Sequence, residues 1–123
     1  MKKILVAEDN PSNRELFREL LESWGYEVVE AEDGEAAVRI AGEANPDAVL
    51  LDIQMPLLDG YEVLGRFRQD PKLAHLPVMA LTAFAMRGDR EKALASGFNA
   101  YHSKPINGPV LKRDIEQLLR NES

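Results

Sequence analysis

Residues 48–56 read AVLLDIQMP, and this stretch decides the fold. Four apolar residues in a row are typical of a strand buried on both faces, as the strands of a parallel sheet are. The run ends in Asp52, and the chain turns soon afterwards at Pro56. An ionised carboxylate avoids such a position unless a partner compensates its charge. Asp52 is therefore the first candidate for a functional residue.

The composition restricts the class of protein. The 123 residues can form one domain with a substantial core, and we expect a single domain over residues 1–123. The absence of cysteine excludes disulfides and zinc–thiolate sites and fits a reducing cytoplasm. A net charge of −6 argues against nucleic acid as the main partner. No apolar stretch is long enough to span a bilayer or to form a signal peptide, so we expect a cytoplasmic protein that binds no membrane.

Four more short apolar runs resemble the one before Asp52, and helical patterns lie between them. The runs cover residues 4–7, 28–29, 78–81 and 100–101. Apolar residues at helical spacing lie within residues 17–24, 37–44, 63–67, 90–95 and 111–119. Strands that alternate with helices predict an α/β fold with a parallel sheet and right-handed crossovers.

Capping and turn residues agree with these boundaries. Ser12 and Glu15 have the spacing of a capping box, which predicts the start of the first helix at this point. Gly25 and Gly97 each follow a helical segment, where a helix C-cap is expected.

Polar residues follow four of the five predicted strands. They are Glu8 and Asp9 after the first strand, Asp52 after the third, Thr82 after the fourth and Lys104 after the fifth. Because the carboxyl ends of parallel strands meet at one edge of a sheet, we expect these side chains to lie together. Each residue alone has a plainer interpretation: the acidic pair as a helix start, Thr82 as a strand residue, Lys104 as a solvated cation.

Taken together, these residues indicate phosphoryl transfer. Three carboxylates outnumber the single ammonium group, and a divalent cation would neutralise the excess. Oxygen ligands without histidine or cysteine favour Mg²⁺. An aspartate can act as the nucleophile, while Lys104 and Thr82 stabilise the transferred group. His75 and His102 lack metal-ligand spacing, and we expect neither to be functional.

The same residues carry a resemblance to a known family. The chain resembles the response regulator receiver domain of two-component signalling over essentially its whole length. The matching stretches are ILVAEDNPSNRELF, PDAVLLDIQMPLLDGYEVL and LPVMALTAFAMRGDREKALASGFNAYHSKPI. The resemblance implies a flavodoxin-like, doubly wound fold: a five-stranded parallel sheet in the order 2-1-3-4-5 with helices on both faces.

The resemblance also implies a role for each candidate residue. Asp52 matches the phosphoacceptor, and Lys104 matches the lysine that contacts the phosphoryl group, next to a cis bond to Pro105. The implied Mg²⁺ ligands are Glu8, Asp9, Asp52 and the backbone carbonyl of Gln54. Thr82 and Tyr101 match a pair that switches conformation, and Ala83 leaves room beside the site. Gln54 and Phe84 match positions that tune the phosphoryl lifetime, and Phe84→Glu is expected to shorten it.

The implied function is that of a signalling switch in a two-component system or phosphorelay. The protein would receive its phosphoryl group from a histidine kinase or a histidine phosphotransfer protein, and would catalyse only its own phosphorylation and dephosphorylation. The fourth helix, fifth strand and fifth helix would form the face that binds a downstream protein, which the sequence does not identify. We expect a monomer or a weak dimer.

Other interpretations differ in the chemistry that they require. A haloacid dehalogenase-type phosphatase needs a second acid two residues after the nucleophile, where this chain has Gln54. A flavodoxin-like cofactor carrier would want a phosphate-binding loop where the chain reads Glu8-Asp9-Asn10-Pro11. A phosphorylation-independent binding module would not need all the site positions filled. The closest alternative is a receiver domain excised from a hybrid histidine kinase. The two ends of the chain favour a free-standing protein, and we expect that form.

Overall fold

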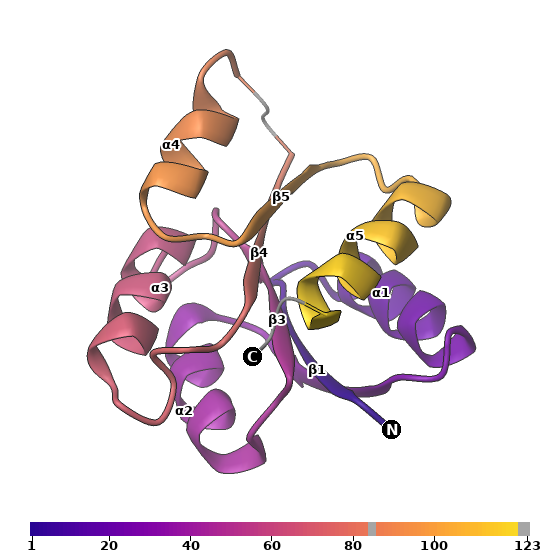
Figure 1. Ribbon diagram of the computed structural model, residues 1–123, viewed down its shortest axis with the longest axis horizontal. Coiled ribbons are helices and arrows are strands. Elements are labelled where there is room, and N and C mark those ends of the chain that lie inside the picture. Colours follow the sequence, from indigo (N-terminus) through magenta and orange to yellow (C-terminus); the bar gives the residue numbers. More distant parts are fainter. Residues whose placement is uncertain (84–85, 121–123) are drawn as a thin grey trace.

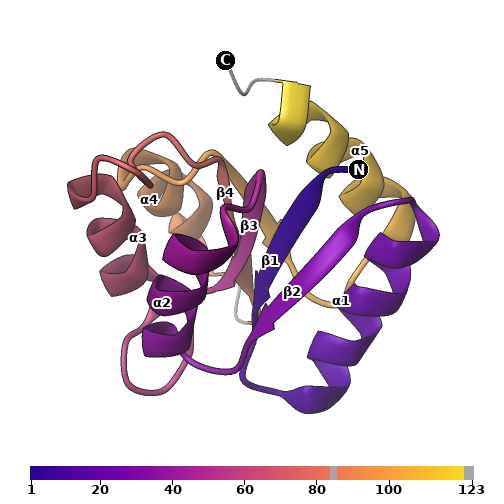
Figure 2. The same cartoon turned by 90° about the horizontal axis from the view of Figure 1, so that it is seen from below.

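The computed structural model describes residues 1–83 and 86–120 as a parallel β-sheet between two layers of helices (Figures 1 and 2). The strands are β1 (Lys3–Ala7), β2 (Glu27–Ala31), β3 (Ala48–Asp52), β4 (Val78–Thr82) and β5 (Ala100–Ser103). The helices are α1 (Pro11–Ser23), α2 (Gly34–Ala44), α3 (Gly60–Gln69), α4 (Asp89–Ala95) and α5 (Gly108–Arg120). Among the described residues, no helix is long and apolar enough to cross a membrane.

The sheet has the order β2-β1-β3-β4-β5, and every neighbouring pair is parallel. The predicted fold class and strand order are therefore confirmed. The central strands β1, β3 and β4 are almost entirely buried, whereas β2 and β5 lie at the edges and are partly exposed. The strand order reverses between β1 and β3, so their carboxyl ends bound the crevice in which such folds hold their sites.

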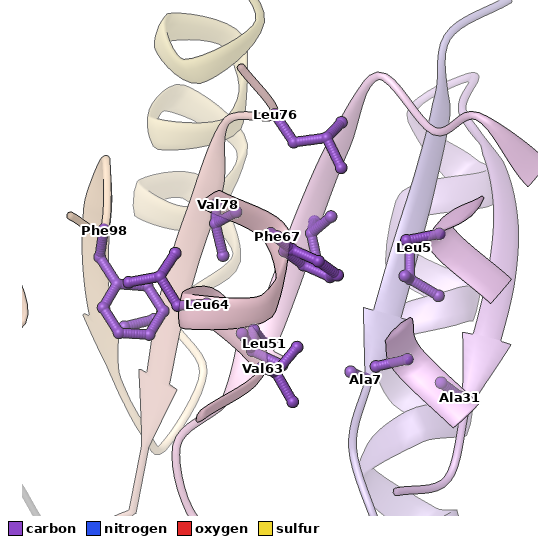
Figure 3. Packing of buried hydrophobic residues seen from close by; sticks show 14 of the residues in the cluster. Leu5, Ala7, Ala31, Leu51, Val63, Leu64, Phe67, Leu76, Val78 and Phe98 are labelled. Atoms are coloured by element: carbon purple, nitrogen blue, oxygen red, sulfur yellow. The ribbon is translucent and has the colours of Figure 1, made fainter. Parts of the chain in front are cut away.

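Two apolar clusters fill the space between the sheet and its helices. Helices α2, α3 and α4 cover one face, where Leu5, Leu51 and Phe67 lie in one cluster (Figure 3). Helices α1 and α5 cover the other face, where Phe17 and Ile115 belong to the second cluster. Because successive strand residues point to opposite faces, a strand covered on both sides must be apolar throughout. This explains the unbroken apolar runs of β1, β3 and β4.

The first helix begins two residues earlier than the capping-box spacing predicted. Asn10 is its N-cap, and the Asn10 side-chain oxygen accepts hydrogen bonds from the backbone N–H groups of Ser12 (2.9 Å) and Asn13 (3.1 Å). Pro11 follows at the first helical position, where its missing N–H costs nothing and its fixed φ suits the helix. The predicted box with Glu15 is therefore wrong. Gly25 and Gly97 do follow helix ends, with φ of 92° and 114°.

A close backbone approach fixes the segment that follows β3. The N–H of Gly60, the first residue of α3, donates to the carbonyl of Ile53 at 2.8 Å. A Cβ atom at Gly60 would lie 2.6 Å from the Cα of Ile53 and 2.9 Å from the carbonyl oxygen of Asp52. Only glycine therefore lets α3 start against the end of β3, and this contact helps to hold Asp52 in place.

Candidate functional site

Asp52 is the last residue of β3, and only 4% of its surface is exposed. One carboxylate oxygen, Oδ1, accepts a hydrogen bond of 2.8 Å from the backbone N–H of Gln54. The other, Oδ2, accepts one of 3.0 Å from the ammonium group of Lys104. The carboxylate is thus compensated, as its burial requires, and both of its oxygens have fixed directions.

Lys104 lies between two buried carboxylates. Its ammonium group donates to Glu8 Oε1 as well as to Asp52 Oδ2, although the lysine follows β5 and Glu8 follows β1. Burial by itself lowers the pKa of Lys104, but the hydrogen bonds and charges of Glu8 and Asp52 outweigh it, so the pKa lies above the ordinary value. Lys104 therefore carries its positive charge throughout the physiological pH range. The Lys104–Pro105 peptide bond is cis.

Three carboxylates are close enough to share one cation. Glu8, Asp9 and Asp52 each offer an oxygen, and these three oxygens lie within 4.8 Å of one another. Glu8 and Asp52 are buried, whereas Asp9 is exposed and leaves the cluster open to solvent. An all-oxygen set that is open on one side fits a hard divalent cation that keeps part of its water shell, as Mg²⁺ does. The residues present therefore fit the predicted metal.

The two predicted switch residues lie on the strands next to the acidic cluster. Thr82 ends β4 and is buried. Tyr101 lies on β5, packed against the cluster that contains Leu51 and Phe67, and its hydroxyl is buried without a hydrogen-bond partner among the described residues. Ala83 is exposed. Phe84, predicted to tune the phosphoryl lifetime, lies outside the described residues.

Two charged residues near the site carry no local signal in the sequence. Arg14, on α1, donates from Nη1 to the backbone carbonyl of Glu8 at 2.9 Å. Its Nε donates to Glu30 Oε1 on β2 at 3.2 Å, and Glu30 Oε2 also accepts from Arg18 at 3.1 Å. Periodicity cannot reveal a contact between residues sixteen positions apart, because it reports only which face of an element is apolar.

His102 lies away from the acidic cluster. It is a buried residue of β5, and its Nδ1 lies 4.0 Å from Oδ2 of Asp114 on α5. Its Nε2 has no hydrogen-bond partner among the described residues. Burial lowers the pKa of His102, and Asp114 opposes this shift only in part. The imidazole is therefore neutral at physiological pH.

A sheet of this order with an acidic cluster and a lysine at the carboxyl ends of its strands defines a class of signalling domain. The family model of the response regulator receiver domain matches residues 4–116. The chain belongs to this family, whose members are signalling switches of two-component systems and not metabolic enzymes.

Individual relatives agree with this assignment. The polar-differentiation response regulator DivK of Brucella ovis is 43% identical over 118 residues, which are 96% of this chain and 96% of that protein. The receiver domain of the sensor histidine kinase PA1611 of Pseudomonas aeruginosa is 38% identical, with a TM-score of 0.90 and 98% of each chain covered. That structure has a magnesium ion coordinated in its active-site cleft. CheY4 of Vibrio cholerae is 28% identical, with a TM-score of 0.89 over 97% of this chain and 99% of that one.

Proposed function

We propose that the protein receives a phosphoryl group on Asp52, in the presence of Mg²⁺, from a histidine kinase or a histidine phosphotransfer protein. The observation that carries the proposal is the environment of Asp52: a buried carboxylate at a strand end, bonded to Lys104 at 3.0 Å and within 4.8 Å of the Glu8 and Asp9 carboxylates. A carboxylate placed only for packing would have no need of two further acids and a shared ammonium group.

The transfer itself requires little covalent chemistry from the protein. An Asp52 oxygen attacks the phosphorus atom of the phosphohistidine, the P–N bond breaks, and the imidazole nitrogen keeps the electron pair. Glu8, Asp9, Asp52 and the Gln54 carbonyl would hold Mg²⁺, which neutralises charge on the phosphoryl oxygens when bound. Lys104 contributes a fixed positive charge at the same place, and the Thr82 hydroxyl can donate a hydrogen bond to the product.

The modification would be read out through α4, β5 and α5. Phosphorylation raises the negative charge at Asp52 and adds acceptor oxygens, so Lys104 and Thr82 gain contacts that only the modified state offers. Such differential contacts shift the equilibrium between conformations. Tyr101, on β5, would be the side chain through which the change at the site reaches the face formed by α4, β5 and α5. A groove lined by residues of α4, β5 and α5, among them Leu94, Ala100 and Leu118, offers a surface for a partner protein.

Intact-mass measurement tests the nucleophile. Wild-type protein is incubated with Mg²⁺ and acetyl phosphate beside Asp52→Asn and Asp9→Asn. We expect one phosphoryl group on the wild type, none in the presence of EDTA, and none on Asp52→Asn at any Mg²⁺ concentration. Asp9→Asn keeps the acceptor but loses a metal ligand, so raising Mg²⁺ is expected to restore its slowed reaction.

The opposite outcomes are equally clear. A phosphoryl group on Asp52→Asn would mean that another residue is the nucleophile. A wild type that gains no phosphoryl group from acetyl phosphate or from a phosphorylated histidine kinase would favour the phosphorylation-independent binding module.

A further inference from the structure

We propose that Arg14 is a positioning residue for Asp9, and that it sets the affinity of the site for Mg²⁺ without touching the ion. The inference rests on the proposed Mg²⁺ site and adds a residue to it. Arg14 lies on α1, and it reaches the site only through the backbone carbonyl of Glu8.

Asp9 is the one carboxylate of the cluster that is exposed. Among the residues that the structure describes, its carboxylate has no hydrogen-bond partner, in contrast to those of Glu8 and Asp52. Neither packing nor a side-chain bond therefore orients it. The direction of the Asp9 Cα–Cβ bond, from which the carboxylate extends, is set by the two peptide units that flank the residue, because these fix its backbone dihedral angles.

Both flanking peptide units are tied. The Glu8 carbonyl and the Asp9 N–H belong to one planar unit, and Arg14 holds this unit by donating to the carbonyl at 2.9 Å. The unit between Asp9 and Asn10 is held by its N–H, which donates to Glu8 Oε2 at 3.3 Å. If Arg14 is removed, the first unit can rotate, and the Cα–Cβ bond of Asp9 is no longer held in the direction that brings its carboxylate to the cluster.

Arg14 is itself held in place. Glu30, on the edge strand β2, accepts from its Nε at 3.2 Å, and the Arg14 side chain is only 18% exposed. Glu30 also accepts from Arg18 at 3.1 Å, but among the described residues Arg18 has no hydrogen bond to Glu8. The two arginines therefore share one carboxylate partner, and only one of them reaches the site.

This difference gives a test in which two explanations predict opposite signs. Arg14→Met removes a positive charge from the neighbourhood of a cation site, so electrostatics alone would strengthen Mg²⁺ binding. Loss of positioning would weaken it. Arg18→Met is the matched control. It also removes one positive charge and one arginine that donates to Glu30, but it leaves the hydrogen bond from Arg14 to the Glu8 carbonyl intact.

The measurement is calorimetric titration of the purified, unphosphorylated proteins with MgCl₂. We expect Arg14→Met to bind Mg²⁺ about tenfold more weakly than the wild type, the lower end of what outer-shell partners of metal ligands contribute. Arg18→Met should equal the wild type or bind slightly more tightly. Near-ultraviolet circular dichroism establishes that each variant is folded. Arg14→Lys, which keeps the charge but not the forked donor, is expected to weaken binding by a smaller factor.

A second readout follows the peptide unit directly. In the metal-free protein, the ¹³C resonance of the Glu8 carbonyl should shift in Arg14→Met, which loses the donor to this carbonyl, and stay in place in Arg18→Met. Mg²⁺ affinity equal to or above that of the wild type in both Arg14 variants overturns the positioning role and leaves the proposed function intact. A wild type that binds no Mg²⁺ overturns the proposed metal site as well, so the two failures are distinguishable.

Discussion

Replacing Lys104 by methionine is expected to destabilise the metal-free protein strongly. The ammonium group is bonded to Glu8 and Asp52, whose side chains are 1% and 6% exposed, and the Lys104 side chain is itself 13% exposed. Methionine fills a similar volume but has no charge. The substitution leaves two buried carboxylates close together without a counter-charge, and this is more costly than the loss of a surface ion pair.

The size of the expected loss in unfolding free energy follows from these contacts. A hydrogen bond to a charged group contributes roughly 1.5–3 kcal/mol, and removing one partner of a buried ion pair costs about 3–5 kcal/mol. Because the cluster is open to solvent at Asp9, we take the lower end, about 3 kcal/mol. At a urea dependence of about 1.5 kcal/mol per M, the unfolding midpoint would fall by about 2 M.

The assay is urea unfolding of the wild type, Lys104→Met and Lys112→Met, followed by the fluorescence of Trp24 in EDTA. Lys112 is exposed on α5, so its replacement should leave the midpoint nearly unchanged. The pKa of Lys104 is higher in the folded state than in the unfolded chain, where it is near 10.5. The stability that Lys104 contributes is therefore fully present below the unfolded-state pKa and is lost only as the pH rises through the folded-state pKa. The gap between wild type and variant should therefore be constant from pH 7 to 9.

Magnesium should reduce the difference in unfolding midpoint between the wild type and Lys104→Met. The variant has one positive charge fewer beside the acidic cluster, so it should bind Mg²⁺ more tightly and gain more stability from it. A Lys104→Met midpoint within 0.3 M, or about 0.5 kcal/mol, of the wild type in EDTA would refute the reasoning, since it would mean that the two carboxylates need no compensation.

Two further predictions concern the scaffold around the site. Gly60→Ala should lower the free energy of unfolding by about 1–3 kcal/mol, because the new Cβ would lie 2.6 Å from the Ile53 Cα. Gly65→Ala on the same helix is the control: its Cβ meets nothing within 4 Å, so the change should be neutral or stabilising. Chemical denaturation compares the two variants. His102→Leu should flatten the pH dependence of stability between pH 7.5 and 5. Burial lowers the folded-state pKa of His102, so the unfolded chain binds more protons and the wild type loses stability as the pH falls through about 6.5. A decline in His102→Leu parallel to that of the wild type would contradict the argument.

Local patterns in the sequence were sufficient for the elements and for the expectation that Glu8, Asp9, Asp52 and Lys104 lie together. The apolar run before Asp52 is continuous because β3 is covered on both faces, so it could be recognised without any knowledge of the neighbouring strands. The polar residues after four of the five strands could be placed together because parallel strands end at one edge. The strand order had to come from the family resemblance, since a run of apolar residues does not specify which strand lies beside it.

The contacts that the sequence did not reveal are those between distant residues with ordinary local roles. Arg14 looks like any polar residue on the outer side of an amphipathic helix, and Glu30 like any polar residue of an edge strand. Their pairing depends on the crossing of α1 over β2, which is a property of the whole fold. The N-cap was misjudged for a different reason: two local signals competed, and Asn10 followed by Pro11 starts the helix earlier than Ser12 would.

The geometry of Lys104 suggests how the metal and the phosphoryl group depend on each other. In the unmodified protein the ammonium group is shared by Glu8 and Asp52, so it is not free to turn towards a phosphoryl group. A divalent cation held by the same carboxylates would take over the compensation of Glu8 and weaken its hold on the lysine. Lys104 could then follow the negative charge that phosphorylation adds at Asp52. The buried ion pairs thus hold the lysine beside Asp52 while the site is unmodified, and on the proposed function Mg²⁺ would assist the reaction in a second way, by competing with the ammonium group for Glu8.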